Sequence, residues 1–237
     1  MVIIDFVLIF TNFFYDKKKL PFYFCFITSI SFDQLDFSTS TEGRRLDATG
    51  INGQSLLKKY APDATGSPFI NPNWVQANLT LSEGKITGPI SIKLNIENNT
   101  LYFLDSSGKE MVAIDGLVKK IDCYSFFSKD NIGNIFKNGY PKIDKQNENY
   151  YYQVFTECKI ELLAKRAKYI RVFKDEMTGQ ITKEFVEEAV TFYIYANNSM
   201  QKFHHTKNFV TDLLKDKEHE IEKFIDNNKI NFKKNLT

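Results

Sequence analysis

The chain has 237 residues, of which 43% are hydrophobic and 15% aromatic, including 22 Phe and 12 Tyr. This apolar content is enough for a packed core, so it excludes a wholly disordered chain. The 31 Lys and Arg nearly balance the 29 Asp and Glu. Because nucleic-acid binding depends on neutralising phosphates, this balance gives no basis for it, and we expect no nucleic-acid partner.

Two apolar runs open the chain, residues 1–15 and 20–32, with Lys17–Lys19 between them. Each is shorter than the roughly 20 residues that a membrane-spanning helix needs. In the second run, a lysine cluster, an apolar stretch and small residues follow in the order of a secretory signal, which predicts cleavage near Ser31. The apolar run before the lysines leaves two alternatives, a membrane anchor made of both runs or buried core segments.

These features predict four parts. Residues 1–31 form the signal-like segment, and residues 32–72 form a polar tether rich in Ser, Thr, Gly, Asp and Asn. An antiparallel β domain follows over 73–205, and a helical tail over 206–237. We expect an exported protein of the periplasm, the cell envelope or the medium, with transient membrane contact through its N-terminal segment.

The β pattern is clearest over residues 75–96. Apolar and polar residues alternate from Val75 to Leu81, a turn follows at Ser82–Lys85, and alternation resumes from Ile86 to Ile96. Period-two alternation is typical of strands with one buried face. Pro89 donates no backbone hydrogen bond, so we expect an edge or a bulge there.

The later strands are separated by clusters of turn residues, a spacing that indicates antiparallel meanders. Residues 159–173 fit either a helix or a strand, and we favour a strand because β-type runs flank them. A long strand is predicted over 184–195. The other predicted strands are 101–104, 110–114, 117–127, 131–136, 150–156 and 200–203.

The last 30 residues have helical spacing. Apolar residues over 209–214 predict one short helix, and those over 221–225 predict a second with Asp216 as its N-cap. Their apolar faces should pack on the sheet or on each other. The sequence therefore predicts a mainly β (α+β) protein, an antiparallel meander sheet or open barrel with two short C-terminal helices.

Motifs of known catalytic sites are missing from the sequence. It contains no Gly-x-Ser-x-Gly elbow, no glycine-rich phosphate loop and no His-Glu-x-x-His pair. Adjacent His204 and His205 would point to opposite faces of a strand, so even with His219 we expect solvated histidines rather than a metal site. We predict no catalytic residue, no metal and no cofactor.

Three consecutive tyrosines, Tyr150, Tyr151 and Tyr152, form the candidate ligand-binding site. Their rings could stack on a sugar or a peptide. The alternative is ordinary packing between strands, which aromatic residues favour in sheets.

Two cysteines remain beyond the signal-like segment, Cys123 and Cys158. In an oxidising compartment they could form a disulfide that closes a long loop. The alternative is a pair of separate thiols, because free cysteines are commonly buried as small apolar residues.

A series of turn and packing signatures extends from Gly66 to Phe232. Its members are Gly66–Asn71, Trp74, Ser82–Lys85, Asn95–Leu104, Met111–Asp115, Tyr150–Val154, Glu222–Ile225 and Asn228-Lys229. This series resembles an uncharacterised family of exported, signal-bearing Bacteroidetes proteins of unknown function. The resemblance implies export, an antiparallel sheet and a closing pair of helices. It implies no activity, cofactor or catalytic residue.

We therefore expect an envelope or secreted protein that acts by binding a partner, either an envelope protein or a glycan. The alternative is a β-rich ligand carrier or enzyme that acts on glycan or lipid near Tyr150–Tyr152. The sequence favours a protein that is not an enzyme and leaves the question open.

Overall fold

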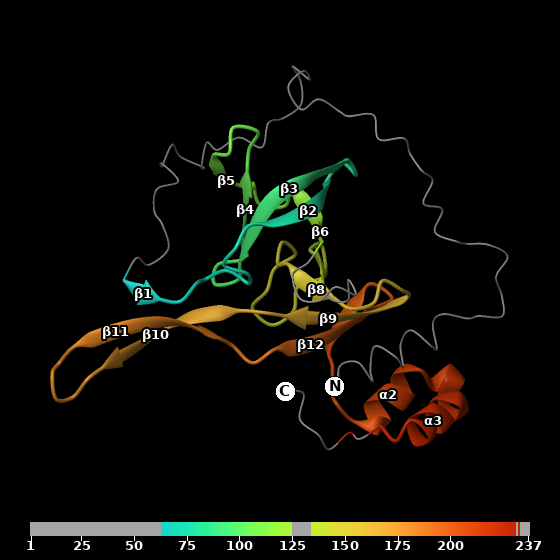
Figure 1. Ribbon diagram of the computed structural model, residues 1–237. Coiled ribbons are helices and arrows are strands. Elements are labelled where there is room, and N and C mark those ends of the chain that lie inside the picture. Colours follow the sequence, from blue (N-terminus) through green and yellow to red (C-terminus); the bar gives the residue numbers. More distant parts are fainter. Residues whose placement is uncertain (1–62, 125–133, 231, 233–237) are drawn as a thin grey trace.

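The computed structural model describes residues 63–124, 134–230 and 232 of the chain. In this part, strands dominate and two short helices close the C-terminal end (Figure 1). The elements are β1 (Ala64–Thr65), β2 (Val75–Leu81), β3 (Ile86–Asn95), β4 (Thr100–Leu104), β5 (Glu110–Val112), β6 (Val118–Cys123), β7 (Ile135–Lys137), β8 (Tyr152–Val154), β9 (Ile160–Lys165), β10 (Lys168–Lys174), β11 (Ile181–Glu187), β12 (Thr191–Ala196), β13 (Ser199–Lys202), α2 (Lys207–Leu213), η1 (Lys215–Lys217) and α3 (Glu218–Asn227).

The larger of two sheets has ten strands in the order β13-β12-β9-β8-β7-β6-β2-β3-β4-β5, and every neighbouring pair is antiparallel. Strands β2 to β5 form one meander and β6 to β9 another, joined where β6 lies beside β2. The sheet is open, with β13 and β5 at its two ends. The predicted mainly β fold with an antiparallel meander and two short helices is confirmed.

The first half of this sheet packs its alternating apolar residues into one core. Ile92 and Leu94 of β3 are 0% and 1% exposed, and Leu79 of β2 and Ile121 of β6 join the same cluster. Complete burial of one such side chain contributes about 1.5–3 kcal/mol. The alternation read from the sequence therefore directs one face of these strands inward.

Strands β9 and β12 are buried on both faces. Leu162 and Ile194 face a cluster shared with the two helices, which contribute Val210 and Ile221 among others. The next residue along β9, Leu163, belongs to a different cluster that is rich in tyrosine. Because side chains alternate across a strand, successive residues supply two separate cores. The helices pack on the sheet and on each other, as predicted.

The expected irregularity at Pro89 is confirmed. The pairing of β2 with β3 shifts register between Ala77 and Leu79, where β3 has one more residue than β2, so the bulge includes Pro89. Neighbouring Gly88 has φ +141°, and a Cβ atom there would lie 2.8 Å from the carbonyl oxygen of Ala77. Only glycine fits this close approach. Pro89 also lies before the part of β3 that pairs with β4, Ile92–Asn95.

The strand predicted over 184–195 is interrupted, and so is the one over 159–173. The first comprises the end of β11 and most of β12, which belong to different sheets. Pairing continues from Lys165–Thr191 to Lys168–Glu187, with two residues between the pairs on one strand and three on the other. This extra residue interrupts the ladder as a β-bulge does.

The helical end differs from the prediction in its cap. Helix α2 begins after Thr206, whose Oγ1 accepts a hydrogen bond from the Phe209 N–H at 3.2 Å. The prediction of Asp216 as an N-cap is wrong, because Asp216 lies inside η1 and α3 follows Lys217 with no side-chain cap bond. The short 3-10 turn joins the helices without an extended residue in the N-cap position.

Residues 63–72, the only described part of the predicted tether, pack against the sheets. Strand β1 pairs in parallel with β11, and Phe69 is 3% exposed. The N–H of Ile70 donates to the Leu94 carbonyl, and the N–H of Ile96 donates to the Pro68 carbonyl, each at 3.0 Å. The packed structure therefore includes residues before 73.

Candidate functional site

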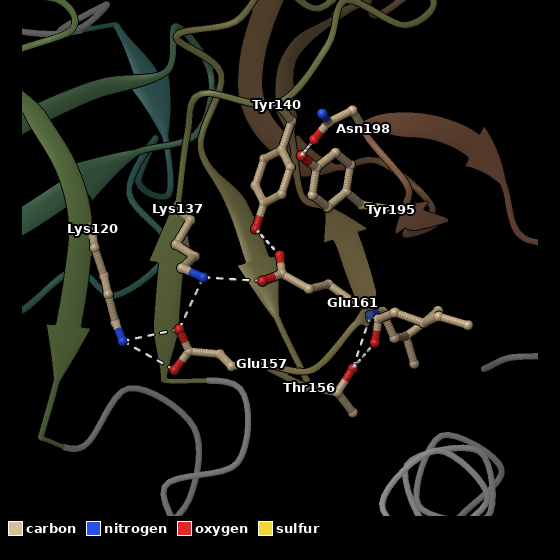
Figure 2. Close-up of polar contacts among 10 residues, drawn as sticks. Lys120, Lys137, Tyr140, Thr156, Glu157, Glu161, Tyr195 and Asn198 are labelled. Carbon is tan, nitrogen blue, oxygen red and sulfur yellow. Dashed lines mark hydrogen bonds and ion pairs between the residues drawn. The ribbon is translucent and has the colours of Figure 1, made fainter. Parts of the chain in front are cut away.

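An ion-pair network crosses one face of β6, β7 and β9 (Figure 2). Lys120 of β6 lies directly opposite Lys137 of β7, and Glu157 binds the Nζ of each at 3.0 Å. Lys137 also binds Glu161 at 3.1 Å, and the Tyr140 hydroxyl donates to the same carboxylate at 2.5 Å. Like charges directly opposite in a sheet are destabilising, so Glu157 compensates an unfavourable pair.

The groups of this network are held in a single protonation state near neutral pH. Burial raises the pKa of Glu157, but hydrogen bonds from Lys137 and Lys120 outweigh it and hold the pKa below its ordinary value. Burial lowers the pKa of Lys137, but Glu157 and Glu161 more than reverse this and raise it. Burial and then the hydrogen bond to Glu161 raise the pKa of Tyr140. A general acid or base works best with a pKa near the working pH, and these three groups are shifted away from neutrality.

The three predicted ligand-binding tyrosines lie mainly inside the protein. Tyr152 is 1% exposed and Tyr151 is 8% exposed, while Tyr150 is half-buried. The Tyr151 hydroxyl donates to the Val118 carbonyl at 2.9 Å, and the Tyr150 hydroxyl donates to the Arg166 carbonyl at 2.7 Å. Tyr151 and Tyr152 therefore present no open ring face for stacking, which is what the packing alternative predicts.

Tyr152 is the centre of an aromatic cluster that the sequence did not indicate. The rings of Tyr140, Tyr150 and Tyr193 meet it nearly edge-on, with centroid distances of 5.7, 5.0 and 5.6 Å. The Tyr193 hydroxyl donates to Asp144 at 2.8 Å. Edge-to-face pairs of this kind add stability beyond their buried area. Of these three ring partners, only Tyr150 lies near Tyr152 in the sequence, so local pattern gave no signal for Tyr140 and Tyr193.

Among the described residues, the two cysteines and the three histidines form no joint site. Cys123 and Cys158 are free thiols in this structure, which matches the alternative of two separate thiols and not the possible disulfide. Burial raises the pKa of both, which keeps them protonated and weakly reactive at neutral pH. His204 and His205 contact the rings of Phe209 and Phe232, in that order. No group of three or more His, Cys, Asp or Glu within residues 63–124, 134–230 and 232 is arranged to hold a metal ion.

The predicted signal segment, its cleavage position Ser31 and most of the predicted tether lie outside the described residues. Within the described ones, no helix is both long and apolar enough to cross a membrane. Export and membrane contact therefore stay predictions from the sequence.

A second candidate site is the arm, defined as residues 168–187, which comprises β10, β11 and the turn between them. Figure 1 shows the arm projecting from the larger sheet. All twelve residues from 171 to 182 are exposed. They include four large apolar side chains, Val172 (57% exposed), Phe173 (43%), Met177 (98%) and Ile181 (61%). A concentration of exposed apolar side chains is typical of interaction sites.

The turn of the arm is closed by Asp175. Its Oδ1 accepts hydrogen bonds from the N–H groups of Met177 at 2.8 Å and Thr178 at 2.7 Å. Gly179, with φ +69°, donates its N–H to the Asp175 carbonyl at 2.8 Å. A side-chain oxygen that binds backbone N–H groups two and three residues on is the usual chemistry of Asp in turns. The arm therefore has a defined tip.

The base of the arm is tied to the larger sheet and to the segment that precedes it. The backbone N–H of Lys168 donates to the Ile96 carbonyl at 3.1 Å. Its ammonium group donates to the carbonyls of Ser67 at 2.9 Å and Phe69 at 2.6 Å. Burial lowers the pKa of Lys168. A two-stranded hairpin alone is marginally stable, so these contacts and β1 support the arm.

The sequence carries a signal for the arm. Two runs rich in β-branched and aromatic residues, 168–174 and 181–187, flank the turn residues 175–179, a pattern that indicates a hairpin. Such composition is the same whether a strand is covered or exposed, so it gives no reason to single out Val172 or Ile181 as a site.

The fold and this site define a mainly β protein with an open antiparallel sheet and a projecting, partly apolar arm. A comparison of the chain with known protein families, curated proteins and solved structures finds no match. The resemblance to an exported Bacteroidetes family stays a prediction.

Proposed function

We propose that this protein is exported and acts as a binding module that holds a partner protein on the arm. The observation that carries the proposal is the run of twelve exposed residues with four large apolar side chains. Hydrophobic burial is the main favourable term in protein association, and these side chains supply apolar area that binding would remove from water. The signal-like segment around Ser31 supports export.

The chemistry of the arm favours a protein partner over a glycan. Val172, Met177 and Ile181 are aliphatic, whereas sugars are held mainly by flat aromatic faces and by polar groups. The one aromatic ring at the outer half of the arm, Phe173, carries the Arg171 guanidinium 4.5 Å from its centroid. That ring face is already occupied by a cation–π contact.

The ion-pair network supports a binding function over catalysis. Glu157 and Lys137 hold their charges through mutual contacts, and Tyr140 keeps its proton. A network of this kind links strands β6, β7 and β9, whereas the arm carries four large exposed apolar side chains. We accordingly propose no reaction for this protein.

Site-specific photo-crosslinking in the producing cell tests the proposal. A photoreactive residue replaces Val172 in the arm, and in the control it replaces Ile86, which is exposed to 67% on β3. We expect a discrete protein adduct from position 172 and none from position 86. Identical adducts from both positions, or no adduct from the arm, would contradict the proposal.

Export is tested separately by fractionation and intact-mass measurement of the native protein. We expect a mass that begins near Phe32, in the periplasm or the medium. A full-length chain confined to the cytosol would refute export without bearing on whether the arm binds a partner.

A further inference from the structure

Strand β10 is an open edge of the three-stranded sheet β1-β11-β10. It has seven residues, whereas the end strands β13 and β5 of the larger sheet have four and three. An edge strand presents backbone N–H and C=O groups that another chain can pair with. The longest edge strand in the described part of the chain is therefore on the arm.

The hydrogen-bond pattern identifies which backbone groups of β10 are open. Antiparallel partners alternate between pairs that exchange hydrogen bonds and pairs whose N–H and C=O point outward. The Asp175 N–H binds the Gln180 carbonyl and the Glu188 N–H binds the Ala167 carbonyl, so odd-numbered positions of β10 bond to β11. The backbone N–H and C=O groups of the even-numbered positions point away from β11.

The outward groups are those of Ile170, Val172 and Lys174, because the fourth even-numbered residue, Lys168, already donates to Ile96. No other residue in the described ranges forms a backbone bond with these three positions. Three N–H donors and three C=O acceptors thus lie in a row, at the spacing of two residues that an added strand matches.

We propose that β10 binds an extended, acidic segment of the partner protein, which adds to the arm as a further strand. This inference rests on the proposed function, because it names how the arm would hold its partner. The main-chain bonds come from Ile170, Val172 and Lys174, and the side chains of β10 select the sequence of the added strand.

Charge decides which kind of strand fits. Strand β10 contains Lys168, Arg171 and Lys174 and no acidic residue. Arg171 pairs with Glu184 of β11, whereas Lys174 is exposed and forms no ion pair with the described residues. Acidic side chains opposite these positions would be attracted across the new pair, since opposite charges stabilise cross-strand neighbours.

The same charges disfavour a second copy of this chain. Full antiparallel pairing of two β10 strands would place Arg171 opposite Arg171 and Lys168 opposite Lys174. Like charges directly opposite are destabilising, and lysine on an edge strand is a common protection against self-pairing. The basic side chains of β10 therefore disfavour pairing with a second β10 strand and favour pairing with an acidic strand.

Amide hydrogen exchange on the purified full chain tests this proposal. The probe is a capped nine-residue peptide with Glu at positions two, five and eight and Ile, Val or Tyr elsewhere. The matched control peptide has Lys at the same three positions. We expect the acidic peptide to slow exchange at Ile170, Val172 and Lys174, and the basic peptide to leave it unchanged.

Substitutions in β10 distinguish main-chain pairing from nonspecific binding of the peptide. Val172→Pro removes an outward N–H that β11 does not use, and edge strands tolerate proline at such positions. Val172→Thr keeps the N–H and the branched shape. We expect loss of the protection with Val172→Pro and its retention with Val172→Thr. Slow exchange at Arg171 in each variant reports that the arm itself remains formed.

A charge reversal gives a second readout. Lys174→Glu should weaken binding of the acidic peptide about three- to tenfold at low salt, and added salt should reduce that difference. The matched control is Lys85→Glu, an exposed turn lysine outside the arm, which should change nothing.

Three results would overturn the inference. They are no protection by the acidic peptide, equal protection by the basic peptide, and protection that rises with protein concentration when no peptide is present, which would indicate a second copy. In each case a crosslinked adduct at position 172 would still support partner binding on the arm by another geometry. Loss of that adduct would refute the proposed function itself.

Discussion

The hydroxyl of Tyr152 gives the sharpest test of the packing described above. Tyr152 is 1% exposed, and its hydroxyl has no hydrogen-bond partner among the described residues. A buried polar group without a partner costs about 1–3 kcal/mol, because it has lost its bonds to water. Tyr152→Phe removes that oxygen and keeps the ring. We expect the free energy of unfolding to rise by about 1 kcal/mol.

The neighbouring Tyr151→Phe is the matched control and should have the opposite sign. Its hydroxyl donates to the Val118 carbonyl at 2.9 Å, and that carbonyl also accepts from Asn138 Nδ2 at 2.8 Å. Since the carbonyl keeps one donor, the loss should be that of a single hydrogen bond, about 1 kcal/mol. The two variants should therefore differ by about 2 kcal/mol.

Urea unfolding followed by circular dichroism measures both variants. For a domain of this size, each kcal/mol shifts the melting temperature by about 2–4 °C, so thermal scans should separate the variants by about 4–8 °C. If Tyr152→Phe lowers the stability as much as Tyr151→Phe does, the reasoning is refuted, because the Tyr152 hydroxyl then has a favourable partner.

Three further predictions concern a glycine, a carboxylate and a helix cap. Gly88→Ala should destabilise the protein well beyond the roughly 1–2 kcal/mol expected for Gly84→Ala. Both glycines have a positive φ, but only at Gly88 would the added Cβ atom clash with the backbone of Ala77. The midpoints of urea unfolding measure this difference. Because the folded-state pKa of Glu157 is lowered, its stabilisation is present above about pH 4.5 and is lost as the pH falls through the folded-state pKa. The free energy of unfolding of Glu157→Gln should therefore fall less steeply with acid than that of the unaltered protein. An equally steep fall in both proteins would contradict the ion-pair geometry. Thr206→Ala should cost about 1 kcal/mol in urea unfolding, and Thr206→Ser should recover most of it.

Much of the secondary structure follows from short-range pattern. The alternation over residues 75–81 predicts β2, and that over 86–96 predicts β3, because a strand with one covered face needs an apolar residue at every second position. Helical spacing likewise placed Ile221 and Ile225 on the buried side of α3. These signals lie within ten residues, where the chain's own geometry decides which side chains share a face.

Strand order could not be predicted in the same way. Lys120 and Lys137 are opposed only because β6 pairs with β7, and Glu157 reaches both from beyond β8. Nothing in the local sequence around any of these residues specifies that meeting. The prediction of Asp216 as a helix cap was wrong for a related reason, because Asp216 lies within a 3-10 turn and not at the N-cap position.

The Tyr150–Tyr152 triplet shows a third limit. A run of aromatics is equally compatible with a stacking surface and with core packing, and the outcome depends on what covers each face. Here Tyr151 packs with the β2–β6 core while Tyr152 packs with Tyr193 on a different cluster. Two successive residues, one just before β8 and one at its start, thus contribute to two cores, which no count of aromatics would reveal.

The continuity of the arm with the main sheet has a mechanical consequence. Strands β10 and β11 continue, after the extra residue, into β9 and β12, which are neighbours within the ten-stranded sheet. A pull on a bound partner along the arm would travel through the covalent chain into these two strands. Moving these two strands together requires sliding along β8 and β13, which loads the hydrogen bonds of both pairings at the same time. We expect a force spectrometer that pulls at Met177 to meet higher resistance than one that pulls at the β13 edge, where bonds open one after another.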